Sequence, residues 1–171
     1  MSGLLFLSSD DFYLGENPKG KILCNRLRGF SLVLFYSTQC EWCQVFIKSY
    51  KKMPELVNGC QFGLINVSKN KEVVFMSRNT ISPISYVPYI ILYNDGKPIV
   101  RYDGPHDEKE LAGFVFEMAK KIQESKQVAP NNTTIKEDPK TGFIAYTPSS
   151  GRSEEIRVCY LNFEDMLKNK K

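Results

Sequence analysis

The apolar positions of the chain fall first into short continuous runs. Residues 4–7, 32–36 and 62–67 are apolar at most positions, and short runs that are apolar on both faces are typical of strands buried within a sheet. Two further runs, residues 89–93 and 99–102, flank an Asn-Asp-Gly turn, which predicts a β-hairpin. These runs supply the expected strands of a sheet.

A second pattern repeats every three to four residues. Downstream of Cys43, apolar residues recur at the spacing of one face of an amphipathic helix, and Pro54 is expected to kink or end this helix near its last turn. Residues 71–78 predict a short helix. Residues 107–125 predict a long helix that begins with a capping box.

The order of these elements predicts an α/β fold. The polar cluster at residues 8–11 is a helix-cap signal directly after the first strand. Residues 1–126 are expected to form one domain, with a central mixed sheet of four to five strands and helices on both faces. Residues 127–171 are expected to be a linker and a C-terminal extension, in which residues 143–147 and 156–161 pair as an extra hairpin.

Composition and charge exclude several classes of function. Of the 171 residues, 23 are basic and 19 are acidic, a nearly balanced charge that gives no electrostatic support for nucleic-acid binding. No apolar run approaches the roughly 18 residues that a membrane span needs, and the N-terminus lacks the basic region of a signal peptide. The five cysteines are odd in number and scattered, unlike a secreted disulfide framework, so a cytoplasmic protein is expected.

The motif Cys40-Glu-Trp-Cys43 carries the clearest chemistry. It lies where a buried strand is expected to end and a helix to begin. Two cysteines three positions apart lie close enough there to form and reopen a disulfide with little backbone movement. The N–H groups of a helix N-terminus stabilise a thiolate at the first sulfur. Cys40 is therefore the expected nucleophile and Cys43 the resolving thiol, with no metal or organic cofactor required.

The remaining cysteines and the histidine help to judge the alternatives to a redox-active cysteine pair. A zinc site needs four ligands, but no second CxxC motif exists, and His106, the single histidine, is expected to face solvent at a helix start. Cys24, Cys60 and Cys159 are expected to be small buried hydrophobes, with a regulatory or intermolecular disulfide from one exposed thiol as the alternative. A redox-inert or structural cysteine pair is a further alternative.

Several further sequence segments, taken in their order along the chain, resemble those of a known family. Leu7-Ser-Ser-Asp-Asp-Phe12, Phe35-Tyr-Ser-Thr-Gln-Cys40, and Val87-Pro88 followed by a strand, an Asp-Gly turn, a last strand and a helix are present in turn. With these segments the sequence resembles the thioredoxin superfamily over about residues 1–125. The resemblance implies that the bond before Pro88 is cis and that Pro88 packs against the two cysteines. It also implies that Val87 offers its backbone N–H and C=O to an extended substrate peptide.

Two features depart from the pattern of that superfamily. Leu34 stands six positions before the first cysteine, where thioredoxins carry a buried acid that moves the proton of the resolving thiol, so slow turnover is expected. Glu41 and Trp42 stand between the cysteines. The carboxylate disfavours ionisation of Cys40 and indicates a reductase-like poise, and Trp42 is expected to be exposed and to contact partner proteins.

The sequence thus predicts a thiol–disulfide oxidoreductase of the thioredoxin or protein disulfide isomerase type, with protein disulfides or thiols as substrates. Cys40 and Cys43 are the predicted catalytic residues, and Trp42, Val87 and Pro88 are the predicted substrate-binding residues. The alternative is a redox-inactive interaction or structural module. The extension is expected to cap the domain's own sheet or to build a homodimer. A looser resemblance to thioredoxin-domain proteins of large DNA viruses adds the virion as an alternative location.

Overall fold

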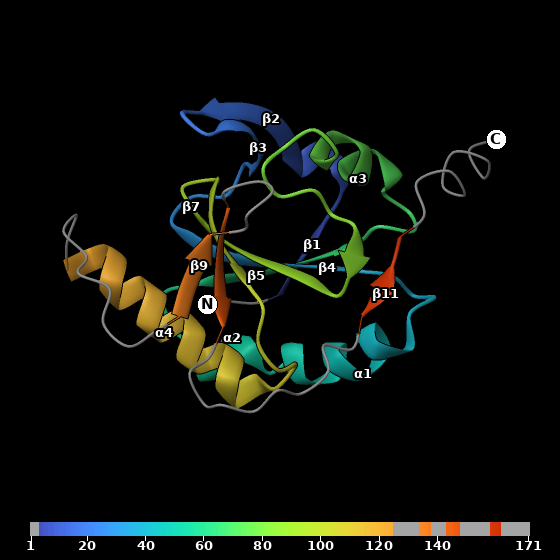
Figure 1. Cartoon of the computed structure of the whole chain (residues 1–171). Coiled ribbons are helices and arrows are strands. Elements are labelled where there is room, and N and C mark those ends of the chain that lie inside the picture. The colour runs from blue at the N-terminus through green and yellow to red at the C-terminus, as the bar shows by residue number, and fades with distance from the viewer. Residues whose placement is uncertain (1–3, 125–133, 138–142, 148–157, 162–171) are drawn as a thin grey trace.

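A mixed sheet of seven strands forms the centre of the protein in a computed structural model that describes residues 4–124, 134–137, 143–147 and 158–161 (Figure 1). In spatial order the strands are β1 (Leu4–Leu7), β5 (Gln61–Asn66), β4 (Phe30–Tyr36), β7 (Tyr89–Asn94), β8 (Lys97–Tyr102), β10 (Ile144–Thr147) and β9 (Thr134–Glu137). β1, β5 and β4 are parallel, β7 is antiparallel to β4 and β8, and β10 is parallel to β8 and antiparallel to β9. The predicted α/β fold is confirmed, and the sheet exceeds the expected four to five strands because β10 and β9 join the edge formed by β8.

Helices cover both faces of this sheet. α1 (Glu41–Tyr50), α2 (Met53–Leu56) and α4 (Glu108–Glu124) lie on one face, and α3 (Lys71–Ser77) lies on the other (Figure 1). Side chains of β4 alternate between the faces: Leu32 and Leu34 pack in the core under α1 and α4, and Val33 and Phe35 pack in the core under α3. The strand is buried on both sides, which explains its continuously apolar sequence.

A hairpin replaces the helix that was expected after the first strand. Only a single 3-10 turn, η1 (Ser9–Asp11), follows β1, and β2 (Phe12–Asn17) then pairs antiparallel with β3 (Gly20–Asn25). The prediction of a helix is wrong here because Gly15 and Pro18 disfavour a helix over this stretch. The hairpin covers the sheet on the same side as α3.

The extension does not form the predicted hairpin. Residues 143–147 supply β10, whose partners are β8 and β9, whereas β11 (Cys159–Tyr160) pairs antiparallel with β6 (Tyr86–Val87). Of residues 127–142, which lie in the predicted linker and extension, the structure describes only β9. The prediction is wrong because β10 pairs with β8 and with β9, the strand before it in the sequence, while β11 pairs with the distant edge of β6.

Local signals place the ends of the helices and the turn of the hairpin. α1 ends at Tyr50, and Pro54 lies in the first turn of α2, where no backbone N–H is needed. The predicted turn between β7 and β8 is confirmed, with Asp95 and Gly96 in the left-handed region at φ of 51° and 83°. Within the described part of the chain, no helix is both long and apolar enough to cross a membrane.

Candidate redox site

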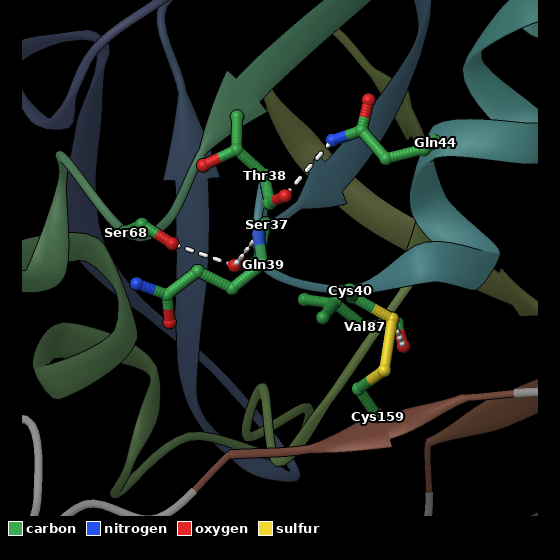
Figure 2. Close-up of a disulfide and its surroundings, with 8 residues drawn as sticks. All are labelled: Ser37, Thr38, Gln39, Cys40, Gln44, Ser68, Val87 and Cys159. Carbon is green, nitrogen blue, oxygen red and sulfur yellow. Dashed lines mark hydrogen bonds between the residues drawn. A yellow bond between two sulfur atoms is a disulfide. The ribbon is translucent and has the colours of Figure 1, made fainter.

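The predicted nucleophile lies at the start of α1. Cys40 is the N-cap residue, and its N–H donates to the Ser37 carbonyl at 3.2 Å. Hydrogen bonds hold the preceding loop: the Ser37 hydroxyl accepts from the Gln39 N–H at 3.1 Å and pairs with the Ser68 hydroxyl at 2.6 Å (Figure 2). The loop therefore holds Cys40 at the N-terminus of α1, whose first turn has unpaired N–H groups, although the Cys40 side chain makes no capping hydrogen bond with them.

β6 brings two of the predicted substrate-binding residues to the same place. The peptide bond between Val87 and Pro88 is cis, and Val87 is fully buried. The sulfur of Cys40 lies 3.8 Å from the carbonyl oxygen of Val87, across a sequence separation of 47 residues (Figure 2). The fold thus places Cys40, at the end of the loop that follows β4, next to Val87 of β6.

The sulfur of Cys40 is bonded to Cys159, not to Cys43 (Figure 2). The Cα atoms of the bonded pair are 6.0 Å apart, although 119 residues separate them in the sequence. The prediction that Cys159 is a small buried hydrophobe is therefore wrong. It failed because the pairing of β11 with β6 brings Cys159 to the site, and no local pattern encodes that contact. The signals available in the sequence were the odd cysteine count and a cysteine within a β-rich run.

Cys43 is a free thiol and is fully buried. Burial raises the pKa of this thiol to about 11, and a backbone hydrogen bond from Ser37 offsets only part of the effect. Burial, and then the nearby Cys43, raise the pKa of the Tyr36 phenol as well. Because Cys40 is only 2% exposed, neither cysteine of the motif is open to solvent while Cys159 is bonded to Cys40.

The residues around the two cysteines differ in exposure. Trp42 is 37% exposed, which confirms its predicted exposure. Leu34 is fully buried, with Leu64 and Ile90 opposite it on the neighbouring strands. The position where thioredoxins carry an acid is therefore apolar, and it belongs to the half of the core that does not contain Cys43.

Aromatic and charged side chains support the pair of strands at the site. The ring of Tyr86 lies 6.0 Å from that of Tyr160 and 5.1 Å from that of Tyr89. The Tyr86 hydroxyl donates to Asp103 at 3.4 Å, and Arg101 donates twice to the same carboxylate, at 2.8 and 3.0 Å. Burial, and then the Asp103 charge, raise the pKa of Tyr86, so its hydroxyl stays protonated. No local sequence pattern marks these residues as a group, because they come from segments far apart in the chain.

The two other cysteines are free and buried, as predicted. Burial raises the pKa of Cys60 to about 12 and also raises that of Cys24, so neither is a ready nucleophile near neutral pH. Among the residues that the structure describes, no three His, Cys, Asp or Glu side chains gather in a group that could hold a metal ion.

The prediction that His106 faces solvent is wrong. Its ring is half-buried and lies 4.9 Å from the ring of Phe46 on α1. The loop that precedes α4 thus packs against α1, a contact between distant segments. Burial lowers the pKa of this imidazole to about 4.

We expect acid to destabilise the protein through His106. Its pKa falls from 6.5 to about 4 on folding, so the unfolded chain binds a proton more readily, and this stability is present above pH 6.5 and lost as the pH falls toward 4. Between pH 7 and pH 5 the loss from this group is about 2 kcal/mol of unfolding free energy. His106→Phe keeps a ring against Phe46 without titrating, so it should lose less stability in urea titrations over this interval. Equal losses in the two proteins would contradict the assignment.

The chain is similar to known proteins in its sequence. Residues 23–117 match the Thioredoxin family model. Over 172 residues the chain is 36% identical to Uncharacterized protein 196R of Invertebrate iridescent virus 6, which covers 96% of this chain and 94% of that protein. It is 33% identical over 168 residues to Uncharacterized protein 020R of Invertebrate iridescent virus 3, with 95% and 94% covered.

Solved structures share the fold. Human ERp44 matches 68% of this chain with a TM-score of 0.52 and 18% identity, and the match spans 29% of ERp44. A mutant thioredoxin from Halobacterium salinarum NRC-1 matches 76% of this chain and 98% of its own length, with a TM-score of 0.50 and 18% identity. At these identities the likeness concerns the fold alone.

Proposed function

Because the chain belongs to the thioredoxin family, we propose that it is a thiol–disulfide oxidoreductase that acts on protein disulfides, with Cys40 as the nucleophile and Cys43 as the resolving thiol. The observation that carries the proposal is the bond at Cys40, whose sulfur lies at the N-terminus of α1 and is joined to a strand paired with β6. A sulfur that can bond to a peptide strand in this position is placed to form a mixed disulfide with a substrate strand.

Substrate binding in this proposal uses the edge of β6. An extended substrate segment pairs its backbone with Val87, which brings a substrate sulfur close to Cys40, itself 3.8 Å from the Val87 carbonyl oxygen. Pro88, in its cis conformation, shapes the strand at this point. The exposed ring of Trp42 supplies apolar contact area to the protein that carries the disulfide.

The exchange then proceeds in two steps through a mixed disulfide. The Cys40 thiolate, stabilised by the N–H groups at the start of α1, attacks one substrate sulfur, and the other leaves with the electron pair and takes up a proton. The Cys43 thiolate next attacks the Cys40 sulfur, forms a Cys40–Cys43 disulfide and releases the remaining substrate thiol. The substrate gains two electrons and two protons, and the cysteine pair loses them.

The second step is expected to be slow at neutral pH. The Cys43 thiol must lose its proton before it attacks, and burial holds its pKa at about 11. Leu34, at the position where thioredoxins carry an acid, supplies no base, because it is apolar and buried in the half of the core that does not contain Cys43. Cys43 is therefore expected to resolve mixed disulfides between Cys40 and substrates slowly.

An insulin-reduction assay with dithiothreitol as the electron donor tests the proposal. The wild-type protein should accelerate the reduction, and Cys40→Ser should lower the rate to that of dithiothreitol alone. Cys60→Ala is the matched control, because Cys60 is a free buried cysteine in the other half of the core and should leave the rate unchanged. If the wild-type protein gives no acceleration, the redox-inactive interaction module is favoured instead.

A further inference from the structure

The C-terminal strand occupies the edge of β6 in the manner expected of a substrate strand. β11 is antiparallel to β6, with Cys159 directly opposite Val87. Beyond this pair, the Leu161 N–H donates to the Ser85 carbonyl at 2.8 Å. The backbone groups that the proposed function assigns to substrates are thus used by the chain itself.

Side chains of this segment alternate as they do in a docked strand. Cys159 and Leu161 are partly buried against the core cluster that contains Cys40. Tyr160 points away, is 79% exposed, and places its ring edge-on to Tyr86 at a centroid distance of 6.0 Å. Backbone pairing, apolar contact and an aromatic pair therefore hold the segment in addition to the disulfide.

We propose that Cys159 is a third redox-active cysteine, carried on an internal substrate strand that occupies the peptide-binding edge until Cys43 displaces it from Cys40. The proposal rests on the proposed function for the reactivity of Cys40. The oxidised protein then has two disulfide isomers, a closed one with Cys40 bonded to Cys159 and an open one with Cys40 bonded to Cys43. In the open isomer the edge of β6 becomes available to an external peptide.

The two isomers interconvert without an external oxidant or reductant. The Cys43 thiolate attacks the Cys40 sulfur, so that a Cys40–Cys43 bond forms while the Cys40–Cys159 bond breaks. Cys159 leaves with the electron pair and takes up a proton from solvent, which replaces the proton that Cys43 released. One disulfide and one thiol are present before and after the step, so the protein is neither oxidised nor reduced.

Docking gives the internal strand an advantage over external peptides. A sulfur that is tethered and held next to its partner reacts at a high effective concentration, whereas a free peptide must first bind. Cys159 can accordingly also release a substrate from Cys40, by attacking the Cys40 sulfur of a mixed disulfide when β11 returns to β6. External substrates must therefore compete with the chain's own strand.

Disulfide mapping of the full chain tests the proposal first. After oxidation with glutathione disulfide and acid quenching with N-ethylmaleimide, proteolytic peptides report which cysteines are bonded. Cys43→Ser should contain the Cys40–Cys159 bond, Cys159→Ser should contain the Cys40–Cys43 bond, and the wild-type chain should contain both isomers. Absence of a Cys40–Cys159 bond from Cys43→Ser would overturn the proposal.

A redox titration tests whether the strand is docked or merely tethered. In the Cys43→Ser background, two glutathione thiols reduce the Cys40–Cys159 bond and form one glutathione disulfide, so the ratio [GSH]²/[GSSG] at half-reduction measures the effective concentration of Cys159. Tyr160→Ala removes the ring that contacts Tyr86 and should lower this value about three- to tenfold. Phe116→Ala, which removes a ring that is 54% exposed on α4, is the control and should not change it. Equal values for Tyr160→Ala and its parent would overturn the docking argument.

The two proposals fail in different ways. A chain that forms both disulfide isomers but does not accelerate insulin reduction contradicts the proposed function. A chain that accelerates insulin reduction but contains only the Cys40–Cys43 bond contradicts the role of Cys159.

Discussion

Opening of the Cys40–Cys159 disulfide should accelerate about tenfold for each pH unit between pH 7 and pH 10. The attacking group is the Cys43 thiolate, and burial raises the pKa of this thiol to about 11. Near pH 7 only about one thiol in ten thousand is ionised, and this fraction grows tenfold with each unit until the pH approaches the pKa. With an ordinary cysteine as the attacking group, the rate would begin to level off near the usual pKa of about 8.5 instead.

The surroundings of Cys43 support this steep profile. Tyr36 of β4 lies near Cys43, and the pKa of its phenol is raised by burial and then by Cys43, whereas burial is the largest influence on the pKa of Cys43 itself. The hydrogen bond from Ser37 stabilises the thiolate, but it does not cancel the cost of burial. Desolvation of Cys43 therefore dominates the pH dependence.

Trapping the released thiol measures this rate. The closed isomer is transferred to buffers of different pH with excess iodoacetamide and no reductant, and peptide mapping follows the alkylation of Cys159. Cys43→Ser should show no alkylation of Cys159 at any pH in this range, because the internal nucleophile is missing. A profile that levels off near pH 8 to 9 in the wild-type chain would contradict the buried thiol as the attacking group.

Phe114→Ala should lower the free energy of unfolding by about 3–5 kcal/mol. Phe114 of α4 is fully buried, and its ring lies 5.0 Å from that of Tyr102 on β8 and 4.7 Å from that of Tyr146 on β10. Truncation leaves a cavity where the helix, the domain and the extension meet. Urea unfolding followed by circular dichroism measures the loss, and it should appear as a lower midpoint.

Phe116→Ala is the matched control on the same helix. The Phe116 side chain is 54% exposed, and truncation of an exposed ring changes stability by about 0.5 kcal/mol or less. Similar losses for the two variants would show that α4 does not pack with Phe114 in the core. If Phe114→Ala loses more stability than Phe116→Ala but clearly less than about 3 kcal/mol, the contact with β10 adds little to the free energy of unfolding.

Local sequence patterns predicted the strands and turns in which the local backbone preference of the residues agrees with their packing in the folded protein. Residues 32–36 are apolar throughout because β4 is buried on both faces, and the Asp-Gly turn formed where it was expected, since positive φ is easily reached there. The helix predicted after residues 8–11 is absent, because a cap signal indicates where a helix can start but not that one continues. The turn η1 ends there, and a hairpin follows.

In the candidate site, too, local features were predictable from the sequence and contacts between distant segments were not. The motif at Cys40 and Cys43 was recognisable because its chemistry depends on a spacing of three residues and on the start of a helix, both local properties. The bonding partner of Cys40 was not recognisable, because it depends on which distant strand pairs with β6. The half-buried position of His106 against Phe46 is another contact of this kind.

Hydrophobic periodicity, turn residues and the CxxC spacing were enough to indicate an α/β domain with a reactive cysteine at a helix start, because each acts over a few neighbouring residues. Only the folded chain decided that β10 and β9 extend the sheet, that β11 lies along β6, and that Cys159 bonds to Cys40. The reason is that strand pairing depends on backbone groups that every residue carries, so the choice of partner depends on which edge the completed fold leaves open.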